Sequence, residues 1–102
     1  MAYFIKTERF TSQTKKLSSE LLNLHLEEHC LWVIGLSNSG IKIVSGYLVN
    51  EQRQPGGGGL LIVEADSYQK AESIIKEDPM IVNKLVDWEL SEWVPVFGQL
   101  MT

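Results

Sequence analysis

An apolar stripe that contains one histidine runs along the first third of the sequence. Leucines and a valine flank this histidine at spacings of three and four residues, in the order Leu22, Leu26, His29, Val33 and Leu36. This spacing places all five side chains on one face of a helix, the face that normally packs against a core. Burying an unpaired polar group costs about 1–3 kcal/mol, so the imidazole of His29 requires a partner.

One candidate partner for His29 lies far downstream, at Asp78 in the Asp78-Pro79 step. Proline disfavours helical geometry in the residue before it, so this step is expected to end a helix and to fix the direction of the carboxylate. A His–Asp pair is the usual arrangement for positioning a base that transfers protons near neutral pH. A structural hydrogen bond of His29 and local backbone hydrogen bonds of Asp78 are the alternative interpretations.

Strand and helix signals alternate along the rest of the chain. Aromatic and β-branched residues predict strands over residues 2–10, 41–49, 60–65 and 86–97, with a loop over 50–59. Capping hydroxyls and apolar periodicity predict helices over residues 14–37 and 66–77, with a further helical turn over 80–85. The resulting order is strand, helix, strand, strand, helix, strand. This is the split βαβ pattern of an α+β, ferredoxin-like sandwich.

The predicted sheet carries both helices on one face and leaves its other face bare. We expect Trp88 and Trp93 on that bare face, where they remain partly exposed unless a second subunit covers them. The chain has 102 residues, enough for one core but not for a deep separate cleft. We therefore predict a single domain over residues 1–102 that forms a homodimer.

The charge and cysteine content argue against several classes of protein. The formal net charge is −4 and Lys15-Lys16 is the longest basic run, which argues against nucleic acid or an anionic membrane as partner. Cys30 is the single cysteine, so no intramolecular disulfide can form and a reducing, cytoplasmic location is expected. The sequence indicates neither a signal peptide nor a membrane-spanning segment.

Two further motifs have simple interpretations. His25 and His29 stand four residues apart in an H-x-x-E-H pattern that can chelate zinc, but no third ligand is indicated and we interpret the spacing as coincidence. The run Gly56–Gly59 could cradle a phosphate through backbone N–H groups. It precedes a predicted strand and lacks the Lys-Ser/Thr of a P-loop, so it is interpreted as a flexible hairpin loop that could close over a pocket.

Several motifs in order resemble the YCII-related (YciI-like) family over most of the chain. The matching positions are the intervals from His29 to Gly40 and from Gly40 to Gly46, then Gly59, residues 61–65, Asp66-Ser67, Ala71, Asp78-Pro79 and Trp93. The chain departs from the family pattern at Tyr47, where a proline is expected after Gly46, and at the four glycines, where Gly-Ser is more usual. An arginine often found shortly before the histidine is also absent.

The resemblance implies a dimeric ferredoxin-like α+β barrel with His29 and Asp78 as its active-site pair. Known chemistry in the family includes elimination of halide from a chlorinated aromatic diol. The leading hypothesis is a small cytoplasmic enzyme of lyase or isomerase type, in which His29 moves a proton and Asp78 orients it. Ser45 and Tyr47 are candidate hydroxyls for binding a phenol or carbonyl oxygen, and neither a cofactor nor a metal is implied. The alternative is a non-catalytic module of the same fold that binds a small molecule or another protein.

Overall fold

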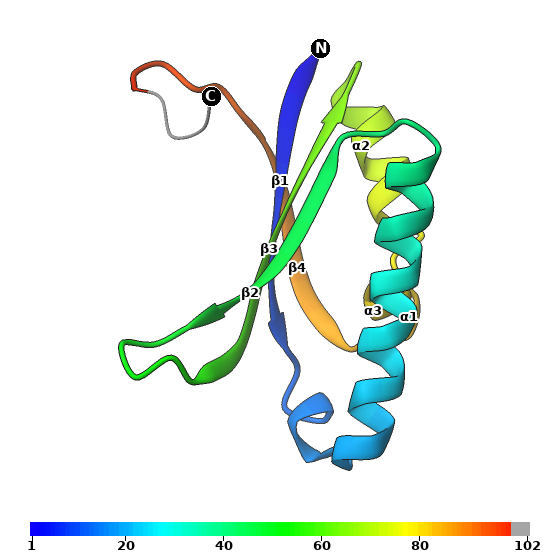
Figure 1. Ribbon diagram of the computed structural model, residues 1–102, viewed down its shortest axis with the longest axis vertical. Helices are drawn as coiled ribbons and strands as arrows, with labels where there is room; N and C mark the ends of the chain where they lie inside the picture. The colour runs from blue at the N-terminus through cyan, green and yellow to red at the C-terminus, as the bar shows by residue number, and fades with distance from the viewer. Residues whose placement is uncertain (99–102) are drawn as a thin grey trace.

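A computed structural model describes residues 1–98 and consists of a sheet covered by helices on one face (Figure 1). Residues 99–102, the end of the predicted domain 1–102, lie outside the described residues. The strands are β1 (Ala2–Phe10), β2 (Ile43–Val49), β3 (Pro55–Ala65) and β4 (Val86–Trp93). The helical elements are the 3-10 turn η1 (Thr14–Lys16) and the helices α1 (Ser19–Asn38), α2 (Tyr68–Ile75) and α3 (Pro79–Val82).

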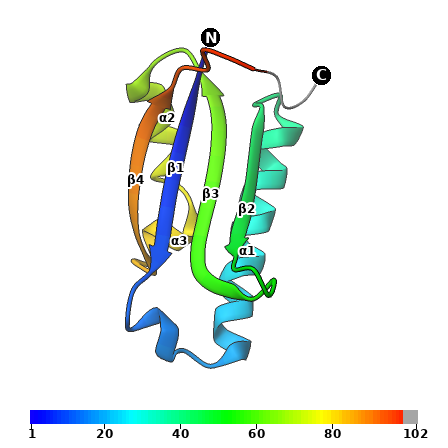
Figure 2. The same ribbon diagram turned by 90° about the vertical axis from the view of Figure 1, so that its left-hand side faces the viewer.

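The strands pair antiparallel in the order β2-β3-β1-β4, so β1 and β3 form the middle of the sheet. Figure 2 shows the strands side by side with the helices behind them. The chain order and strand order together confirm the predicted α+β, ferredoxin-like split βαβ sandwich. Within residues 1–98, no helix is both long enough and apolar enough to cross a membrane.

The first long helix begins later than the sequence predicted. The helix expected over residues 14–37 is wrong at its start, because Thr14 belongs to η1 and is buried. The Thr14 hydroxyl donates a hydrogen bond to the carbonyl of Leu85 at 2.7 Å, a contact that ties η1 to the segment before β4. Ser18 caps α1 instead, with its hydroxyl accepting from the backbone N–H of Leu21 at 3.2 Å.

The glycine run belongs to a strand, which corrects the predicted loop. The loop over residues 50–59 is too long, because β3 already begins at Pro55. Gly59 pairs with Glu8 of β1 and with Tyr47 of β2, so both neighbouring strands hold its backbone. A Cβ at this position would come within 3.2 Å of the Cγ of Glu8. The Glu8 side chain therefore occupies the space where a side chain of residue 59 would lie, which favours glycine in this strand. Because residues 55–59 belong to β3, they do not form a phosphate-binding loop.

The last strand ends at Trp93, and the predicted end at Phe97 is wrong. Trp93 pairs with Tyr3, close to the beginning of β1 at Ala2, so β1 offers almost no backbone beyond this point. Pro95 also lacks the backbone N–H that continued pairing requires. The strand β4 therefore ends where β1 offers almost no further residues for pairing and where Pro95 cannot donate a backbone hydrogen bond.

The two tryptophans expected on the open face lie on opposite sides of the sheet. Trp88 packs against the buried core under the helices, which contradicts the prediction for this residue. Alternate residues of a strand share a face, and Trp88 shares the covered face with Val86 and Leu90. Trp93 is on the open face, where 45% of its surface is exposed.

The core lies between the sheet and the short helices α2 and α3. Its main cluster consists of Phe4, Leu61, Val63, Ala65 and Leu90 of the sheet with Ala71 and Ile75 of α2. A second cluster is formed by Met80, Leu85 and Val86. The apolar stripe of α1, in contrast, is only partly buried along its whole length. This helix therefore leaves room between itself and the sheet, and the candidate site lies there.

Candidate active site

Four side chains from separate elements form one hydrogen-bonded chain between α1 and the sheet. Nδ1 of His29 on α1 lies 2.8 Å from Oδ1 of Asp78, the residue before α3. Nε2 of the same ring lies 2.8 Å from Oγ of Ser45 on β2. Lys6 on β1 donates from Nζ to Oδ2 of Asp78 at 2.7 Å. The fold thus brings Asp78 and Ser45 into direct contact with the two nitrogens of the His29 ring.

Asp78 is fully buried, and both of its carboxylate oxygens are engaged. Oδ1 accepts from the backbone N–H of Met80 at 2.9 Å, which caps α3, and also contacts His29. Burial alone would raise the pKa of Asp78. The hydrogen bond with His29 and the charge of Lys6 outweigh it and hold the pKa of this carboxyl below its usual value. The backbone cap of α3 and the contact with His29 therefore involve the same side chain.

The ionised carboxylate of Asp78 determines which ring nitrogen of His29 carries the proton. A carboxylate can only accept, so Nδ1 must donate to Asp78 and Nε2 is left with its lone pair. The Ser45 hydroxyl then donates to Nε2. A base oriented in this way can take a proton at Nε2 while the carboxylate stabilises the imidazolium that forms.

Sequence reasoning missed two charged residues of the site, Lys6 and Glu8. Lys6 is fully buried on β1, and its ammonium forms ion pairs with both Asp78 and Glu8. The signal was present in the strand pattern, because Lys6 and Glu8 alternate in phase with the buried Phe4. A lysine in the inward phase of a central strand requires a buried anion, and Asp78 supplies it.

A cavity of about 650 Å³ lies beside the hydrogen-bonded chain. Polar groups enter it from His29, Ser45 and Glu8. Its apolar walls come from α1, from α3 and from residues near the glycine run: Leu22, Leu26, Val33 and Ile34, then Met80, then Phe10 and Pro55. Such a mostly apolar cavity with a few converging polar groups is typical of small-molecule sites.

Tyr47, the fourth candidate residue, lines the same cavity at its rim. Its side chain is 74% exposed, whereas Ser45 contacts His29 directly. The structure therefore groups Ser45 with the His–Asp pair and leaves Tyr47 at the entrance. Cys30 also lines this cavity from α1 and is exposed.

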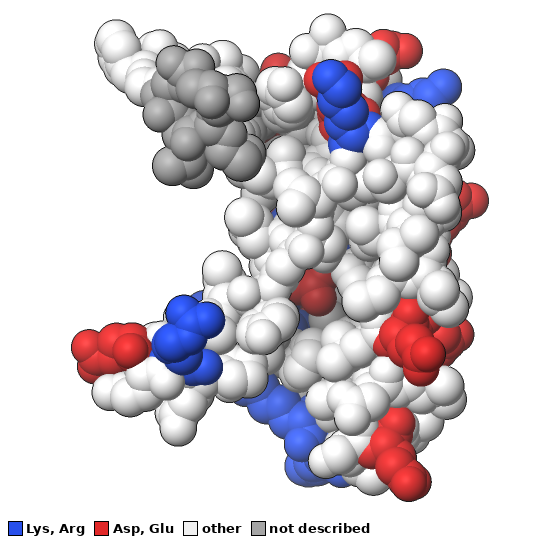
Figure 3. All heavy atoms as spheres, viewed as in Figure 1, with Lys and Arg blue, Asp and Glu red and all other residues white. Residues whose placement is uncertain are grey.

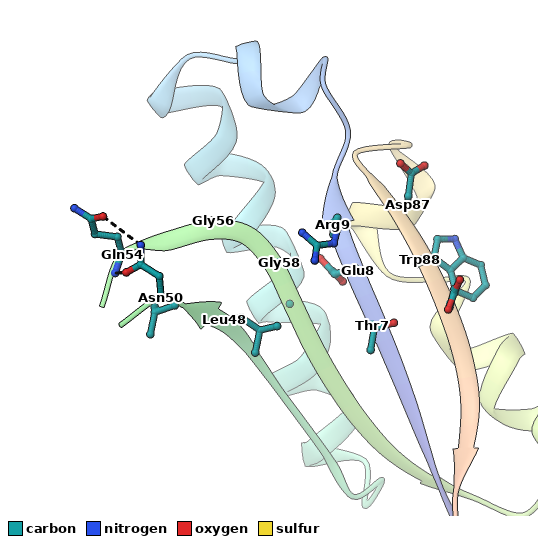
Figure 4. A pocket seen from close by; sticks show the side chains of 13 residues that line it. Thr7, Glu8, Arg9, Leu48, Asn50, Gln54, Gly56, Gly58, Asp87 and Trp88 are labelled. Atoms are coloured by element: carbon teal, nitrogen blue, oxygen red, sulfur yellow. Dashed lines mark hydrogen bonds between the residues drawn. The ribbon is translucent and has the colours of Figure 1, made fainter. Parts of the chain in front are cut away.

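A second hollow, of about 810 Å³, lies on the open face of the sheet between the curled β2–β3 hairpin and strands β1 and β4 (Figure 4). Figure 3 shows this hairpin standing out from the side of the molecule. Figure 1 shows this hairpin projecting away from the helix layer. Thr7, Arg9 and Asp87 line the hollow from β1 and β4, and Leu48 lines it from β2. Glu8 lines both cavities, together with Gly58 and Gly59.

The H-x-x-E-H pattern does not assemble a metal centre in the described part of the chain. Among residues 1–98, no group of three or more His, Cys, Asp or Glu side chains is arranged to hold a metal ion. Nδ1 of His25 lies 3.2 Å from a carboxylate oxygen of Glu28 on the same helix. Both nitrogens of His29 already have hydrogen-bond partners.

The fold is shared with several solved structures. The chain aligns with 5-chloro-2-hydroxyhydroquinone dehydrochlorinase (TftG) from Burkholderia phenoliruptrix AC1100, solved with 2,5-dihydroxybenzoquinone, at a TM-score of 0.68 and 18% identity over 90% of this chain and 93% of that one. It also aligns with a dimeric ferredoxin-like protein from an uncultured marine organism, at a TM-score of 0.54 and 20% identity over 99% and 100% of the two chains. A protein from Agrobacterium tumefaciens aligns with a TM-score of 0.53 and 21% identity over 99% and 100%. No family model and no curated protein sequence matches the chain.

Proposed function

We propose that this chain is a YCII-like enzyme of lyase or isomerase type that acts on a small organic, aromatic or carbonyl substrate. The observation that carries this proposal is the pair of contacts at His29, to Asp78 through Nδ1 and to Ser45 through Nε2. One nitrogen is held by a buried carboxylate, and the other is presented to the cavity as a base. The likeness to a dehydrochlorinase supports the same class of chemistry.

The proposed reaction begins when a substrate hydroxyl replaces the Ser45 hydroxyl at Nε2 of His29. Nε2 accepts the hydroxyl proton, and the electron pair left on the substrate oxygen moves into the ring or the adjoining double bond. In an elimination, the leaving group departs with its own bonding pair, and in an isomerisation, a proton returns at another atom. Asp78 stabilises the imidazolium until it gives the proton to solvent or product.

The same proposal includes a homodimer formed through the open face of the sheet. Tyr3, Val44 and Trp93 are exposed apolar residues of this face, and Leu48 lines its hollow. Several exposed apolar residues on one sheet face are typical of an interface, and a structural neighbour is described as dimeric. The lone, exposed Cys30 agrees with a reducing, cytoplasmic location.

Sedimentation velocity tests the dimer. The native chain should sediment at twice its monomer mass, and Leu48→Glu should shift it towards the monomer. Leu31→Glu is the matched control, because Leu31 is an exposed leucine on α1, away from the open face. A native monomer, or equal effects of the two variants, would remove the open face as the interface.

Turnover of a small panel of compounds tests the chemistry. The panel contains 5-chloro-2-hydroxyhydroquinone, followed by chloride release and quinone absorbance, and chlorine-free hydroquinones, followed by exchange of ring protons for deuterium. His29→Gln should lower kcat/KM by about 10²–10⁴-fold, the usual contribution of a positioned base. His25→Gln is the control, since His25 lies on the same helix but outside the cavity lining.

The alternative function, a non-catalytic binding module, predicts a different result. The buried position of Asp78 and its cap of α3 are the observations that favour this alternative. A module of this kind would bind members of the panel without turning any of them over. Turnover that survives His29→Gln would contradict the proposed mechanism directly.

A further inference from the structure

Glu8 is a charged residue that lines the cavity beside His29 and has no role in the proposed mechanism. Its side chain is 12% exposed, and it lines the cavity together with His29 and Ser45. Oε1 pairs with the buried ammonium of Lys6. Among residues 1–98, no hydrogen-bond donor is found on the other oxygen, Oε2. Glu8 therefore combines a position fixed by Lys6 with spare acceptor capacity in a residue that lines the cavity.

The strand beside Glu8 makes room for this side chain. A Cβ at Gly59 would come 3.2 Å from Cγ of Glu8 and 3.3 Å from the carbonyl oxygen of Gly46. The absence of a side chain at Gly59 thus lets the Glu8 carboxylate lie against β3 at the cavity. The ammonium of Lys6 forms ion pairs with both the Glu8 and the Asp78 carboxylates.

The charges around the cavity favour one sign of ligand. Lys6 contributes one positive charge, while Glu8 and Asp78 contribute two negative charges, so the group carries a net charge of −1 when His29 is neutral. Among the described residues 1–98, those that line the cavity include no lysine and no arginine. An anionic ligand would meet the carboxylate of Glu8 without a cation to pair with, at a cost that low local polarity increases.

We propose that Glu8 is a specificity-determining residue that accepts a hydrogen bond from a hydroxyl or amine of the substrate and excludes substrates that carry a carboxylate. The inference rests on the proposed function, because it takes the cavity beside His29 as the substrate site. It adds the substrate class: a small, mostly apolar molecule, neutral or cationic, with one donor group besides the group that His29 deprotonates.

Three probes that differ only in charge test this assignment. They are 4-hydroxybenzylamine, 4-hydroxybenzyl alcohol and 4-hydroxybenzoate, which share a phenol ring and carry a cation, a neutral hydroxyl and an anion. Isothermal titration calorimetry with the native protein at pH 7 should give amine and alcohol affinities at least about tenfold above that of the benzoate. Glu8→Gln should reduce this preference to about twofold or less, chiefly through tighter binding of the benzoate.

Two controls keep the result interpretable. Glu92→Gln removes one exposed carboxylate outside the cavity lining and should retain the native preference, which separates local from overall charge. Circular dichroism and the urea midpoint of Glu8→Gln show whether the fold is kept. Should this variant unfold, Glu8→Asp provides the test, because it keeps the charge and should keep the preference for amine and alcohol.

The outcomes separate this inference from the proposed function. Equal affinities for the three probes, or a native preference that persists in Glu8→Gln, would overturn the role of Glu8 while leaving the chemistry of His29 intact. If none of the probes binds the native protein, the assignment of Glu8 fails, while turnover of the hydroquinone panel and its loss in His29→Gln still decide the proposed function. A turnover that depends on His29, with a preference that depends on Glu8, supports both.

Discussion

Replacing Lys6 by methionine removes the ammonium of a buried ion-pair network and keeps most of the aliphatic chain. Lys6 and Asp78 are both fully buried, and the ammonium contacts the carboxylates of Asp78 and Glu8. In Lys6→Met, two carboxylates face each other without their counter-ion. Removing one partner of a buried pair costs about 3–5 kcal/mol, since the other charge stays desolvated. We expect Lys6→Met to lose that much free energy of unfolding at pH 7.

Urea denaturation followed by tryptophan fluorescence measures this loss, since Trp32 and Trp88 both pack against the core. A small domain has a total stability of about 5–15 kcal/mol and a urea slope of about 1–3 kcal/mol per M, so the midpoint should fall by at least about 1 M. Lys70→Met is the matched control, because Lys70 is exposed on α2, and it should change stability by less than about 0.5 kcal/mol.

The double variant Lys6→Met/Asp78→Asn tests the reason for the loss. Asparagine can still cap α3, while the charge that Lys6→Met leaves behind is gone. The double variant should therefore be more stable than the sum of the two single effects predicts. A loss below about 1 kcal/mol in Lys6→Met, or strict additivity of the two changes, would refute the argument that a desolvated carboxylate dominates the cost.

Three further predictions concern pH, the serine hydroxyl and the glycine strand. The pKa of Asp78 is held below its ordinary value of 3.8, so the ionised carboxylate stabilises the fold at neutral pH, and this stability should decline as the pH falls from about 5 through the lowered pKa. Urea unfolding at pH 2–5 should show a weaker decline for Asp78→Asn than for the native protein, and identical declines would contradict the prediction. Ser45→Ala should lower kcat/KM by about tenfold at most, the value of one hydrogen bond, and a thousandfold loss in steady-state assays would instead assign a nucleophile. Gly59→Ala should lower the free energy of unfolding by urea by about 1–3 kcal/mol, because the new Cβ would crowd Glu8. Gly46→Ala is the control, because a Cβ there meets no atom within 4 Å, and equal stabilities of the two variants would contradict the prediction.

Local patterns in the sequence predicted the fold class, and their failures share one cause. The glycines before Leu60 have low strand propensity, yet β1 and β2 hold their backbone and Glu8 fills the space above Gly59. Thr14 has the hydroxyl of a helix cap, but it bonds to Leu85, 71 positions away. In both cases a contact that is distant in sequence overrides a local preference.

The site was predictable to the extent that helical phase and strand phase decide which way a side chain faces. Phase placed His29 on the inner face of α1, and the turn before Pro79 restricted Asp78, but only the packed fold brings their atoms to 2.8 Å. Lys6 had the same kind of signal, an inward phase next to Phe4. Its partner is 72 positions away, and nothing in the spacing of residues indicates that distance in space.

The two duties of Asp78 bear on how relatives of this chain should be judged. The carboxylate begins α3 through Met80 and neutralises the buried Lys6, and neither duty involves catalysis. A relative that had lost all chemistry would still need an acidic residue before its proline in order to fold. His29 also hydrogen-bonds this carboxylate, but neither His29 nor Ser45 begins a helix or neutralises the buried Lys6. In relatives of this fold, an Asp-Pro step is therefore expected for structural reasons alone. The presence of the histidine together with the serine indicates which relatives to test for activity.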